Sequence, residues 1–149
     1  MPSIEQLKQA TRDFFDKHWD TNSGIVQPEW SEPWMFFHEV PFNNHRGCYV
    51  HVTKEDVVYI GVALNSGIEG YKDHSLGARI RNYWEVDKTK EKLDGKTYYK
   101  PSTSLMERGI DTIYTLGFPL GEQEYLAIAL EHYLIQRLNP RDNIIYNSR

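Results

Sequence analysis

A carboxylate within the apolar face of a predicted helix is the first group in this sequence that could do chemistry. Hydrophobic periodicity predicts a helix over residues 121–138, and Glu131 lies in the middle of its apolar face. Five apolar residues share that face: Ala127, Ile128, Leu134, Ile135 and Leu138. Because an unpaired carboxylate is costly to bury, Glu131 either pairs with a structural charge or belongs to a functional site. The helix alone does not decide between the two.

Two tyrosines on neighbouring predicted strands form a second candidate group. Residues 48–53 and 57–62 alternate between apolar and polar positions, which predicts two strands joined by a tight three-residue turn. When the apolar faces of both strands join one core, strand parity places Tyr49 and Tyr59 together on the other face. His51 shares that face and is expected at the surface. The tyrosines are either a stabilising cross-strand pair or part of a site.

An arginine and a tyrosine four positions apart form the third candidate group. Ser75 is a candidate N-cap for a short helix whose apolar side carries Leu76 and Ile80. Arg79 and Tyr83 are neighbours on the flank of this helix, because residues four positions apart lie one turn apart. Taken alone, Arg79 is typical of a solvated helix residue.

The remaining elements complete an α+β order. A capping box at residues 3–6 predicts an amphipathic N-terminal helix, and residues 111–118 predict a third strand. The expected fold is α+β, with helices packed on a small three-stranded mixed sheet and an N-terminal extension that is helical and irregular. Within that aromatic-rich extension, residues 35–40 are a predicted short strand. The charged residues 85–100 are expected to form a solvated loop.

The N-terminal helix needs a surface to pack on, because its apolar residues follow helical spacing. We expect this helix to dock on its own domain. The alternative is docking on a second copy of the chain, which would produce a homo-oligomer through the N-terminal extension.

Composition and charge limit the class of protein. The chain has 149 residues, a formal net charge of −4 and one cysteine. A single cysteine excludes an internal disulfide and favours a reducing compartment. No apolar run is long enough to span a membrane, and residues 1–10 lack the core of a signal peptide, so we expect a cytoplasmic protein without a membrane partner. The negative charge argues against a large non-specific nucleic-acid surface but leaves room for a local basic groove.

The candidate residues occur in an order that resembles the GIY-YIG nuclease superfamily. Five elements carry the resemblance: Gly47-Cys48-Tyr49 in place of G-I-Y, Tyr59-Ile60-Gly61, Arg79 with Tyr83, Glu131, and Pro140 with Asn143. They cover residues 47–143. There are three departures. Cys48 replaces the usual aliphatic residue, Val62 stands where many members have a lysine, and residues 66–75 lengthen the loop before Arg79.

This resemblance implies a catalytic domain over residues 47–149, preceded by an extension over residues 1–46. The implied activity is metal-dependent hydrolysis of DNA to 5′-phosphate and 3′-hydroxyl ends. The implied catalytic residues are Tyr49, Tyr59, Arg79, Tyr83, Glu131 and Asn143, of which Asn143 orients its neighbours.

The resemblance also implies a role for each reacting group. Glu131 would bind Mg²⁺ or Mn²⁺, and Arg79 would neutralise charge on the phosphate. Tyr49 is the candidate general base, which requires a nearby cation to lower its pKa. Tyr59 and Tyr83 would hydrogen-bond the water or the phosphate.

Three basic residues are expected to contact the DNA backbone: Lys72, Arg81 and Lys100. The sequence Tyr98-Tyr99 before Lys100 offers base stacking beside such a contact. These contacts would supply the local basic groove that the net charge leaves room for.

Two other functions remain as alternatives. The first is a catalytically silent GIY-YIG fold that serves as a nucleic-acid-binding or assembly module, which Val62 and the low basicity favour. The second is a cysteine enzyme that uses Cys48 with His51. Strand alternation argues against the second, because it sends these two side chains to opposite faces.

Overall fold

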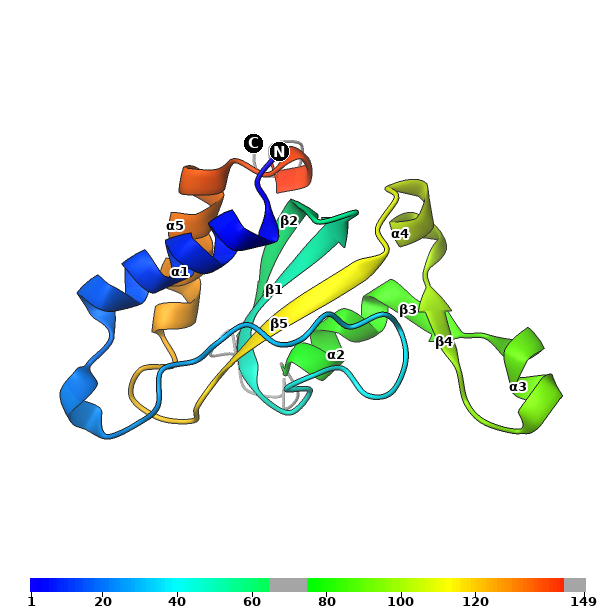
Figure 1. Cartoon of the computed structure of the whole chain (residues 1–149). Helices are drawn as coiled ribbons and strands as arrows, with labels where there is room; N and C mark the ends of the chain where they lie inside the picture. The colour runs from blue at the N-terminus through cyan, green and yellow to red at the C-terminus, as the bar shows by residue number, and fades with distance from the viewer. Residues whose placement is uncertain (65–74, 144–149) are drawn as a thin grey trace.

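Three antiparallel strands form the centre of the structure (Figure 1). The computed structural model describes residues 1–64 and 75–143. Its main strands are β1 (Arg46–Thr53), β2 (Asp56–Ala63) and β5 (Thr112–Phe118). They lie in the order β2-β1-β5, and β1 pairs antiparallel with both neighbours. The α+β class is therefore confirmed, whereas the predicted mixed sheet is wrong.

The path of the chain between β2 and β5 explains the antiparallel order. Strand β2 ends with Ala63 opposite Gly47, near the start of β1. Strand β5 begins with Thr112 opposite Val52, near the end of β1. The connecting segments therefore carry the chain along the length of the sheet before β5 begins. A strand that starts from that end must run against β1.

The β1–β2 hairpin closes with a two-residue turn, not the predicted three-residue turn. Thr53 pairs with Asp56, and the residues between them are Lys54 and Glu55. Their φ angles are 55° and 105°, so both lie in the positive region that two-residue hairpin turns require. A two-residue turn by itself would put the wrong strand faces together.

A bulge in β2 brings the matching faces of β1 and β2 back to the same side of the sheet. The register shifts between His51 and Val52 of β1, where Val58 is the extra residue on β2. As a result, Val58 packs on the tyrosine face and not, as its alternation predicted, on the other face. Tyr49 and Tyr59 still share one face, as predicted, because the register beyond the bulge has the expected parity.

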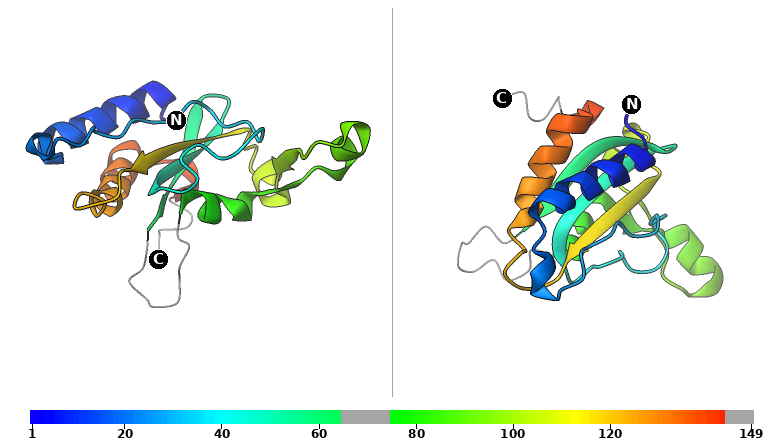
Figure 2. Two further views of the ribbon diagram at one scale, coloured as in Figure 1. Left: turned by 90° about the horizontal axis from the view of Figure 1, so that it is seen from below. Right: turned by 60° about the vertical axis from the view of Figure 1, so that its left-hand side comes forward.

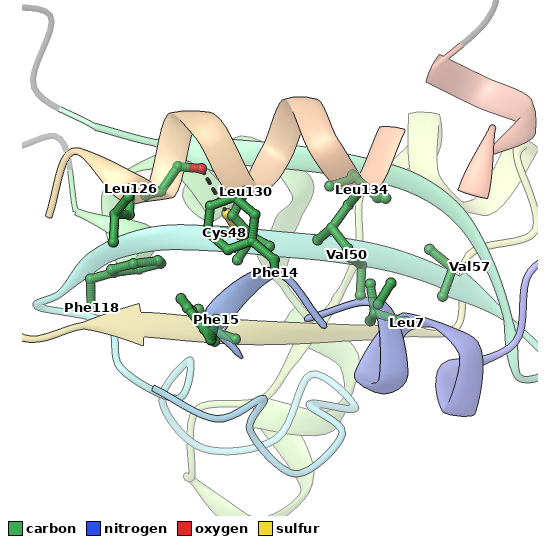
Figure 3. Packing of buried hydrophobic residues seen from close by; sticks show 14 of the residues in the cluster. Leu7, Phe14, Phe15, Cys48, Val50, Val57, Phe118, Leu126, Leu130 and Leu134 are labelled. Carbon is green, nitrogen blue, oxygen red and sulfur yellow. Dashed lines mark hydrogen bonds between the residues drawn. The ribbon is translucent and has the colours of Figure 1, made fainter. Parts of the chain in front are cut away.

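Two long helices, α1 (Ile4–His18) and α5 (Leu126–Leu138), cover one face of the sheet (Figure 3). The predicted capping box is confirmed, because Ser3 N donates to Gln6 Oε1 at 2.8 Å and Gln6 N donates to Ser3 Oγ at 3.1 Å. An ion pair of 2.6 Å joins Asp13 of α1 to Arg137 of α5. The buried cluster includes Leu7, Phe14, Phe15, Cys48, Val50, Leu130 and Leu134. The apolar side of α1 thus has its partner surface within the chain.

The helix that carries Glu131 begins later than predicted and turns a different face to the core. A bend and a turn occupy residues 121–125, and α5 begins at Leu126. Leu130 is fully buried, whereas 52% of the surface of Ile128 is exposed. Glu131 is therefore half-buried at the border of the apolar face and not at its middle.

Short helices and an aromatic loop cover the opposite face, which carries the tyrosines. These helices are α2 (Leu76–Ile80), the 3₁₀ turn η2 (Arg81–Tyr83) and α4 (Thr103–Glu107). Ser75 caps α2 as predicted, because its hydroxyl accepts a backbone N–H of the first turn at 3.2 Å. Residues 35–40 form no strand, although Trp34 makes an isolated β-bridge with Ile113 of β5.

Residues 84–101 form an arm that extends away from the sheet (Figure 2). The arm consists of β3 (Trp84–Val86), α3 (Lys88–Asp94) and β4 (Tyr99–Pro101), and β3 pairs antiparallel with β4. The predicted solvated loop is therefore wrong. At the base of the arm, the rings of Trp84 and Tyr99 lie 4.3 Å apart, and Ser102 N donates to Tyr83 O at 2.9 Å. These contacts anchor the arm beside Tyr83.

The N-terminal extension contributes to both buried clusters. A 3₁₀ turn, η1 (Thr21–Ser23), follows α1. Leu7 and Phe15 belong to the cluster under α1 and α5, and Trp34 and Phe36 belong to the cluster under the tyrosine face. The domain boundary at residue 46 stays a prediction. In the part of the chain that the structure describes, no helix has both the length and the apolar character to cross a membrane.

Replacing Leu130 and Ile128 tests which face of α5 packs on the sheet. Leu130→Ala leaves a cavity in the core and should lower the free energy of unfolding by about 2–5 kcal/mol. Ile128→Ala removes an exposed side chain and should change that free energy by less than about 0.5 kcal/mol. Urea unfolding followed by circular dichroism measures both. Equal losses in the two variants would contradict this orientation of α5.

Candidate functional site

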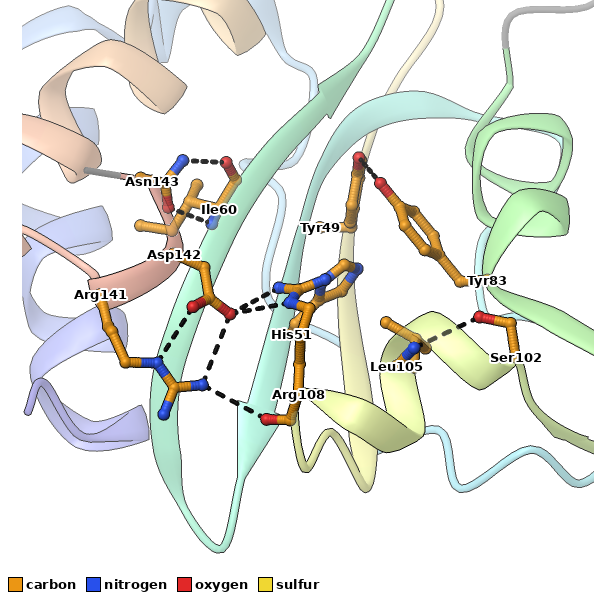
Figure 4. A network of polar contacts seen from close by, with 10 residues as sticks. All are labelled: Tyr49, His51, Ile60, Tyr83, Ser102, Leu105, Arg108, Arg141, Asp142 and Asn143. Carbon is orange, nitrogen blue, oxygen red and sulfur yellow. Dashed lines mark hydrogen bonds and ion pairs between the residues drawn. The ribbon is translucent and has the colours of Figure 1, made fainter. Parts of the chain in front are cut away.

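The hydroxyl group of Tyr49 lies at the centre of the candidate site. Tyr49 is on β1 and has no exposed surface. Its Oη lies 3.2 Å from the Oη of Tyr83 on η2 (Figure 4). The ring centroid of Tyr49 lies 6.2 Å from that of Tyr59 and 5.9 Å from that of Tyr83. Three tyrosines that the sequence predicts on separate elements therefore meet on one face of the sheet.

Glycines on the strands make this close packing of Tyr49 feasible. Gly61 of β2 pairs with Tyr49, and a Cβ atom at Gly61 would lie 2.4 Å from Cζ and 2.5 Å from Oη of Tyr49. Any larger residue there would displace the phenol. A Cβ atom at Gly47 would lie 2.0 Å from the backbone oxygen of Leu116. The glycines of the G-x-Y and Y-I-G sequences thus have a steric explanation.

Burial keeps the phenol of Tyr49 protonated. Desolvation raises the pKa of Tyr49 well above its ordinary value, and the neighbouring phenols of Tyr83 and Tyr59 raise it further. A hydrogen bond from Arg79 lowers that pKa but does not outweigh the burial. Tyr49 as it stands is a hydrogen-bonding phenol, and a base role would require additional positive charge close to it.

Tyr59 and Tyr83 are the more accessible phenols of the cluster. Both side chains are half-buried, in contrast to Tyr49. Burial raises the pKa of Tyr59, and the neighbouring phenol of Tyr83 raises it further. A hydrogen bond with Tyr49 lowers the pKa of Tyr59. The phenol of Tyr59 therefore keeps its proton at neutral pH, and both phenols can form hydrogen bonds with a ligand.

Arg79 and Glu131 bring opposite charges to the tyrosine cluster. The pKa of the Arg79 guanidinium is raised, first by its hydrogen bond with Tyr49. Burial raises the pKa of Glu131, while the charges of His132 and Arg79 lower it. The Glu131 carboxylate in turn contributes to the raised pKa of Tyr59. Arg79 and Glu131 therefore lie within electrostatic reach of each other and of the same phenols.

The surroundings of Glu131 fit a hard divalent cation. Its carboxylate is half-buried and makes no hydrogen bond or ion pair with the described residues. A cation would offset the cost of this burial, and one carboxylate with several waters is a usual way to hold Mg²⁺. Over residues 1–64 and 75–143, no three His, Cys, Asp or Glu side chains gather at one point. Within the tyrosine cluster, Glu131 is the carboxylate that could hold Mg²⁺ or Mn²⁺.

Asn143 holds the edge strand beside the tyrosines. Its Oδ1 accepts from Ile60 N at 2.7 Å, and its Nδ2 donates to Ile60 O at 2.9 Å (Figure 4). The side-chain amide thus occupies the open edge of β2 as a neighbouring strand would. Because Ile60 lies between Tyr59 and Gly61, these two bonds fix the backbone that positions both residues. With 1% of its surface exposed, Asn143 acts through this backbone.

No sequence pattern predicts the buried polar network that adjoins the tyrosines. His51 has no exposed surface, so its expected surface position is wrong. Arg108 Nη2 lies 3.1 Å from His51 Nδ1 and forms a 2.7 Å ion pair with Asp142 (Figure 4). Arg141 pairs with the same carboxylate at 3.0 Å. Burial alone would raise the pKa of Asp142, but hydrogen bonds from Arg141 and Arg108 hold it below its ordinary value.

His51 is held in its neutral form by this network. A guanidinium can only donate, so His51 Nδ1 accepts from Arg108 and Nε2 carries the proton. Burial, assisted by the Arg108 charge, lowers the pKa of His51 to about 3. The imidazole ring stacks on Tyr59 at 4.9 Å and meets Tyr83 edge-to-face at 4.5 Å, between centroids. Its contribution is to support the two accessible phenols. The one sequence signal for this role is the strand alternation that places His51 on the face of Tyr49.

Arg81 and Lys100, two of the three residues expected to contact DNA, have their partners outside the tyrosine cluster. Arg81 lies 4.1 Å from the ring centroid of Trp84 and donates to Trp84 O at 3.0 Å. Lys100 is exposed on the arm and forms a 3.6 Å ion pair with Glu85. Residues 66–74 of the predicted insertion, which include Lys72, lie outside the described residues.

Cys48 faces away from the candidate site. Its side chain is fully buried under α5, where Sγ donates to Ala127 O at 3.3 Å, and burial raises its pKa well above the ordinary value. His51 lies in the opposite direction, as the strand alternation predicts. The structure therefore offers no cysteine–histidine pair between these two residues.

Comparison of the chain with family models, with curated proteins and with solved structures finds no match in any of the three.

The neutral state of His51 predicts a loss of stability as the pH falls. The unfolded histidine binds a proton near pH 6.5, whereas the folded one does so only near pH 3, so the unfolded state holds more protons between these values. The contribution of His51 to the free energy of unfolding should therefore fall by about 1.4 kcal/mol per pH unit below about pH 6. Chemical denaturation of the wild type and His51→Gln at a series of pH values measures this difference.

His132→Gln is the matched control, because it removes an exposed histidine of α5. Its pH dependence should follow that of the wild type, whereas the curve of His51→Gln should be flatter between about pH 4 and pH 6. Parallel curves for the wild type and His51→Gln would show that His51 is not held neutral.

Proposed function

We propose that this chain is a GIY-YIG-type endonuclease that hydrolyses DNA phosphodiester bonds with a divalent metal ion and leaves 5′-phosphate and 3′-hydroxyl ends. The observation that carries the proposal is the convergence of five side chains from β1, β2, α2, η2 and α5: Tyr49, Tyr59, Arg79, Tyr83 and Glu131. Together they supply a carboxylate for a cation, a permanent positive charge and several hydroxyl groups. Phosphodiester hydrolysis requires such groups to bind the phosphate and to stabilise its transition state.

In this proposal, Arg79 neutralises the negative charge that develops on the phosphate. Arg79 is an exposed residue, and its interaction with the phenol of Tyr49 raises the pKa of its guanidinium. A guanidinium keeps its charge at any working pH and matches the geometry of phosphate oxygens. Arg79 is therefore a binding group for the scissile phosphate.

In this proposal Tyr59 and Tyr83 hold the attacking water, and Tyr49 receives its proton only in the ionised form, after losing its own proton. Tyr59 and Tyr83 are accessible enough to bond the water or a phosphate oxygen. Tyr49 remains the candidate general base, although its pKa must fall on substrate binding for that role. The hydrogen bond from Arg79 already acts in that direction.

Glu131 would hold the metal ion. A Mg²⁺ or Mn²⁺ ion bound there supplies a Lewis acid for the leaving 3′ oxygen. For this role Glu131 must stay ionised. Burial raises its pKa, and a nearby positive charge opposes this rise.

DNA is the proposed partner, and the cytoplasm is the proposed compartment. A reducing environment suits the single thiol of Cys48, which is buried. A homo-oligomer would have to use a surface other than the apolar side of α1, because that side is buried within the chain.

A catalytically silent binding or assembly module is the second candidate function. It is favoured by the complete burial of Tyr49 and by the raised pKa that keeps this phenol protonated. In such a module the tyrosine cluster would be structural, and removing the Glu131 charge would change stability without changing any activity.

Cleavage of supercoiled plasmid in Mg²⁺ tests the proposed activity. The wild type should produce nicked and linear DNA, and EDTA should abolish this cleavage. Glu131→Gln keeps the shape of the side chain and removes its charge, so cleavage should fall at least about a hundredfold, the scale expected for losing a group that acts on transition-state charge. A DNA ligase should reseal the nicks without end repair.

Glu122→Gln is the matched control, because Glu122 is exposed just before α5. It should cleave at the wild-type rate. Activity that survives in Glu131→Gln would contradict the assigned site, and nicks that resist the ligase would contradict the proposed ends.

A further inference from the structure

A cleft outside the tyrosine cluster lies between residues 34–42 and the arm. Its volume is about 580 Å³, which is within the range of small-ligand sites. Its lining includes Phe37, His38 and Glu39 from the loop and Lys96, Tyr98 and Tyr99 from the arm. None of the five converging side chains lines it, so the proposed hydrolysis does not account for this cleft.

Backbone strain holds Phe37 out of the core. Phe36 and His38, on either side of it, both have a φ of 64°, a left-handed conformation that is uncommon for residues other than glycine. Phe36 is 5% exposed, whereas Phe37 is 54% exposed. The loop is thus built so that one phenylalanine joins the core and the next is presented to solvent. Strain of this kind persists only where the surrounding structure enforces it, and it is concentrated at functional sites.

Contacts of Trp34 enforce this conformation. Trp34 pairs with Ile113 of β5 through backbone bonds of 2.8 and 3.1 Å. Its Nε1 donates to His38 O at 3.2 Å, which closes the loop around Phe36 and Phe37. The ring of Phe36 packs 4.5 Å from that of Trp34. The exposed ring of Phe37 therefore stands on a fixed base, which reduces the entropy lost when a ligand stacks on it.

Tyr98 supplies a second ring next to Phe37. The two ring centroids lie 6.1 Å apart with an angle of 30° between the ring planes. Tyr98 Oη donates to Asp94, which orients the phenol. Two nearly parallel rings, one of them largely exposed, offer a planar apolar surface to a flat aromatic ligand. A nucleobase is such a ligand, and it stacks on aromatic side chains whatever its identity.

The arm carries exposed lysines, and one of them, Lys96, lines the cleft beside these rings. Asp87 and Asp94 use their carboxylates to accept backbone N–H groups of Lys90 and Lys96, at 3.2 and 2.9 Å. Four exposed lysines make no ion pair with any described side chain: Lys88, Lys90, Lys92 and Lys96. Their charges therefore remain available for phosphate groups, despite the negative net charge of the whole chain.

The cleft adjoins a second cavity that reaches the helix carrying Arg79. This smaller cavity of about 180 Å³ shares His38, Glu39 and Tyr99 with the cleft and extends to Gly77 of α2. The arm follows Tyr83 directly in the chain and is bonded to it through Ser102. The two cavities therefore adjoin the elements that carry Arg79 and Tyr83.

We propose that this cleft binds an unpaired base of a single-stranded DNA segment, with the lysines of the arm on its phosphates. The choice of DNA rests on the proposed function, whereas the preference for an unpaired base rests on the cleft. In a duplex the base faces are covered by their neighbours, so only an unstacked base can reach the ring of Phe37. The candidate site would then act on DNA that contains an unpaired segment.

Binding by Glu131→Gln without divalent metal tests this proposal, because cleavage cannot interfere. Fluorescence anisotropy would measure the affinity for a labelled single-stranded oligothymidine and for a blunt duplex of equal length. Adding Phe37→Ala should weaken single-strand binding about tenfold or more and leave duplex binding within about twofold. Adding Phe37→Trp should retain the single-strand affinity.

Met35→Ala is the matched control, since Met35 is 67% exposed on the same loop but does not line the cleft. It should leave both affinities unchanged. Equal losses for single strand and duplex in Phe37→Ala, no loss at all, or no single-strand binding by the parent protein would each overturn the proposal. Plasmid cleavage by the wild type distinguishes failure of the proposed nuclease activity from failure of the proposed base-binding cleft. Cleavage without any effect of Phe37→Ala keeps the nuclease and rejects the cleft, whereas the reverse result keeps the cleft and rejects the nuclease.

Discussion

The close approach of the Tyr49 phenol to the backbone of Gly61 is the constraint on which the candidate site depends. A phenol can lie across a neighbouring strand only where that strand has no side chain, and a Cβ atom at Gly61 would lie 2.4 Å from the ring. This packing buries Tyr49 completely and brings its hydroxyl to Tyr83. The same burial raises the pKa of Tyr49. The packing that fixes Tyr49 in the structure therefore works against its proposed role as general base.

The C-terminal residues of the described chain secure this arrangement from two sides. Asn143 pairs with Ile60 at the open edge of β2 and so fixes the strand that carries Tyr59 and Gly61. Asp142, its neighbour, holds Arg108, which in turn keeps His51 neutral against the tyrosine rings. Within this network Arg108 satisfies His51 Nδ1, whereas the buried His51 Nε2 makes no hydrogen bond with the described residues. The accessible phenols are therefore supported by residues that are buried or partly buried.

The parts of the fold that depend on local interactions could be predicted from the sequence. The capping box of Ser3 and Gln6 and the N-cap of Ser75 involve residues three positions apart, so short patterns reveal them. The shared face of Tyr49 and Tyr59 follows from strand alternation alone. For the candidate site, only the resemblance to the GIY-YIG superfamily, and not the residue pattern, placed Tyr83 with these tyrosines.

The parts that depend on tertiary contacts could not be predicted in this way. The bulge at Val58 and the two-residue turn compensate each other, so neither is visible in the apolar pattern. The apolar residues of α5 are distributed around much of the helix. Periodicity alone therefore predicted Ile128 as buried in place of Leu130. His51, Arg108 and Asp142 come from segments far apart in the sequence, and only the fold brings them together.

We propose that Glu131 and the tyrosine cluster form one site that binds a divalent cation. Broadening of protein NMR signals by Mn²⁺ is a direct test, since a paramagnetic ion affects only nearby nuclei and no substrate is needed. Mn²⁺ should broaden the ring signals of Tyr59 and Tyr83 in the wild type, and Glu131→Gln should abolish this effect. Broadening that persists in Glu131→Gln, or that leaves both rings unaffected in the wild type, would contradict it.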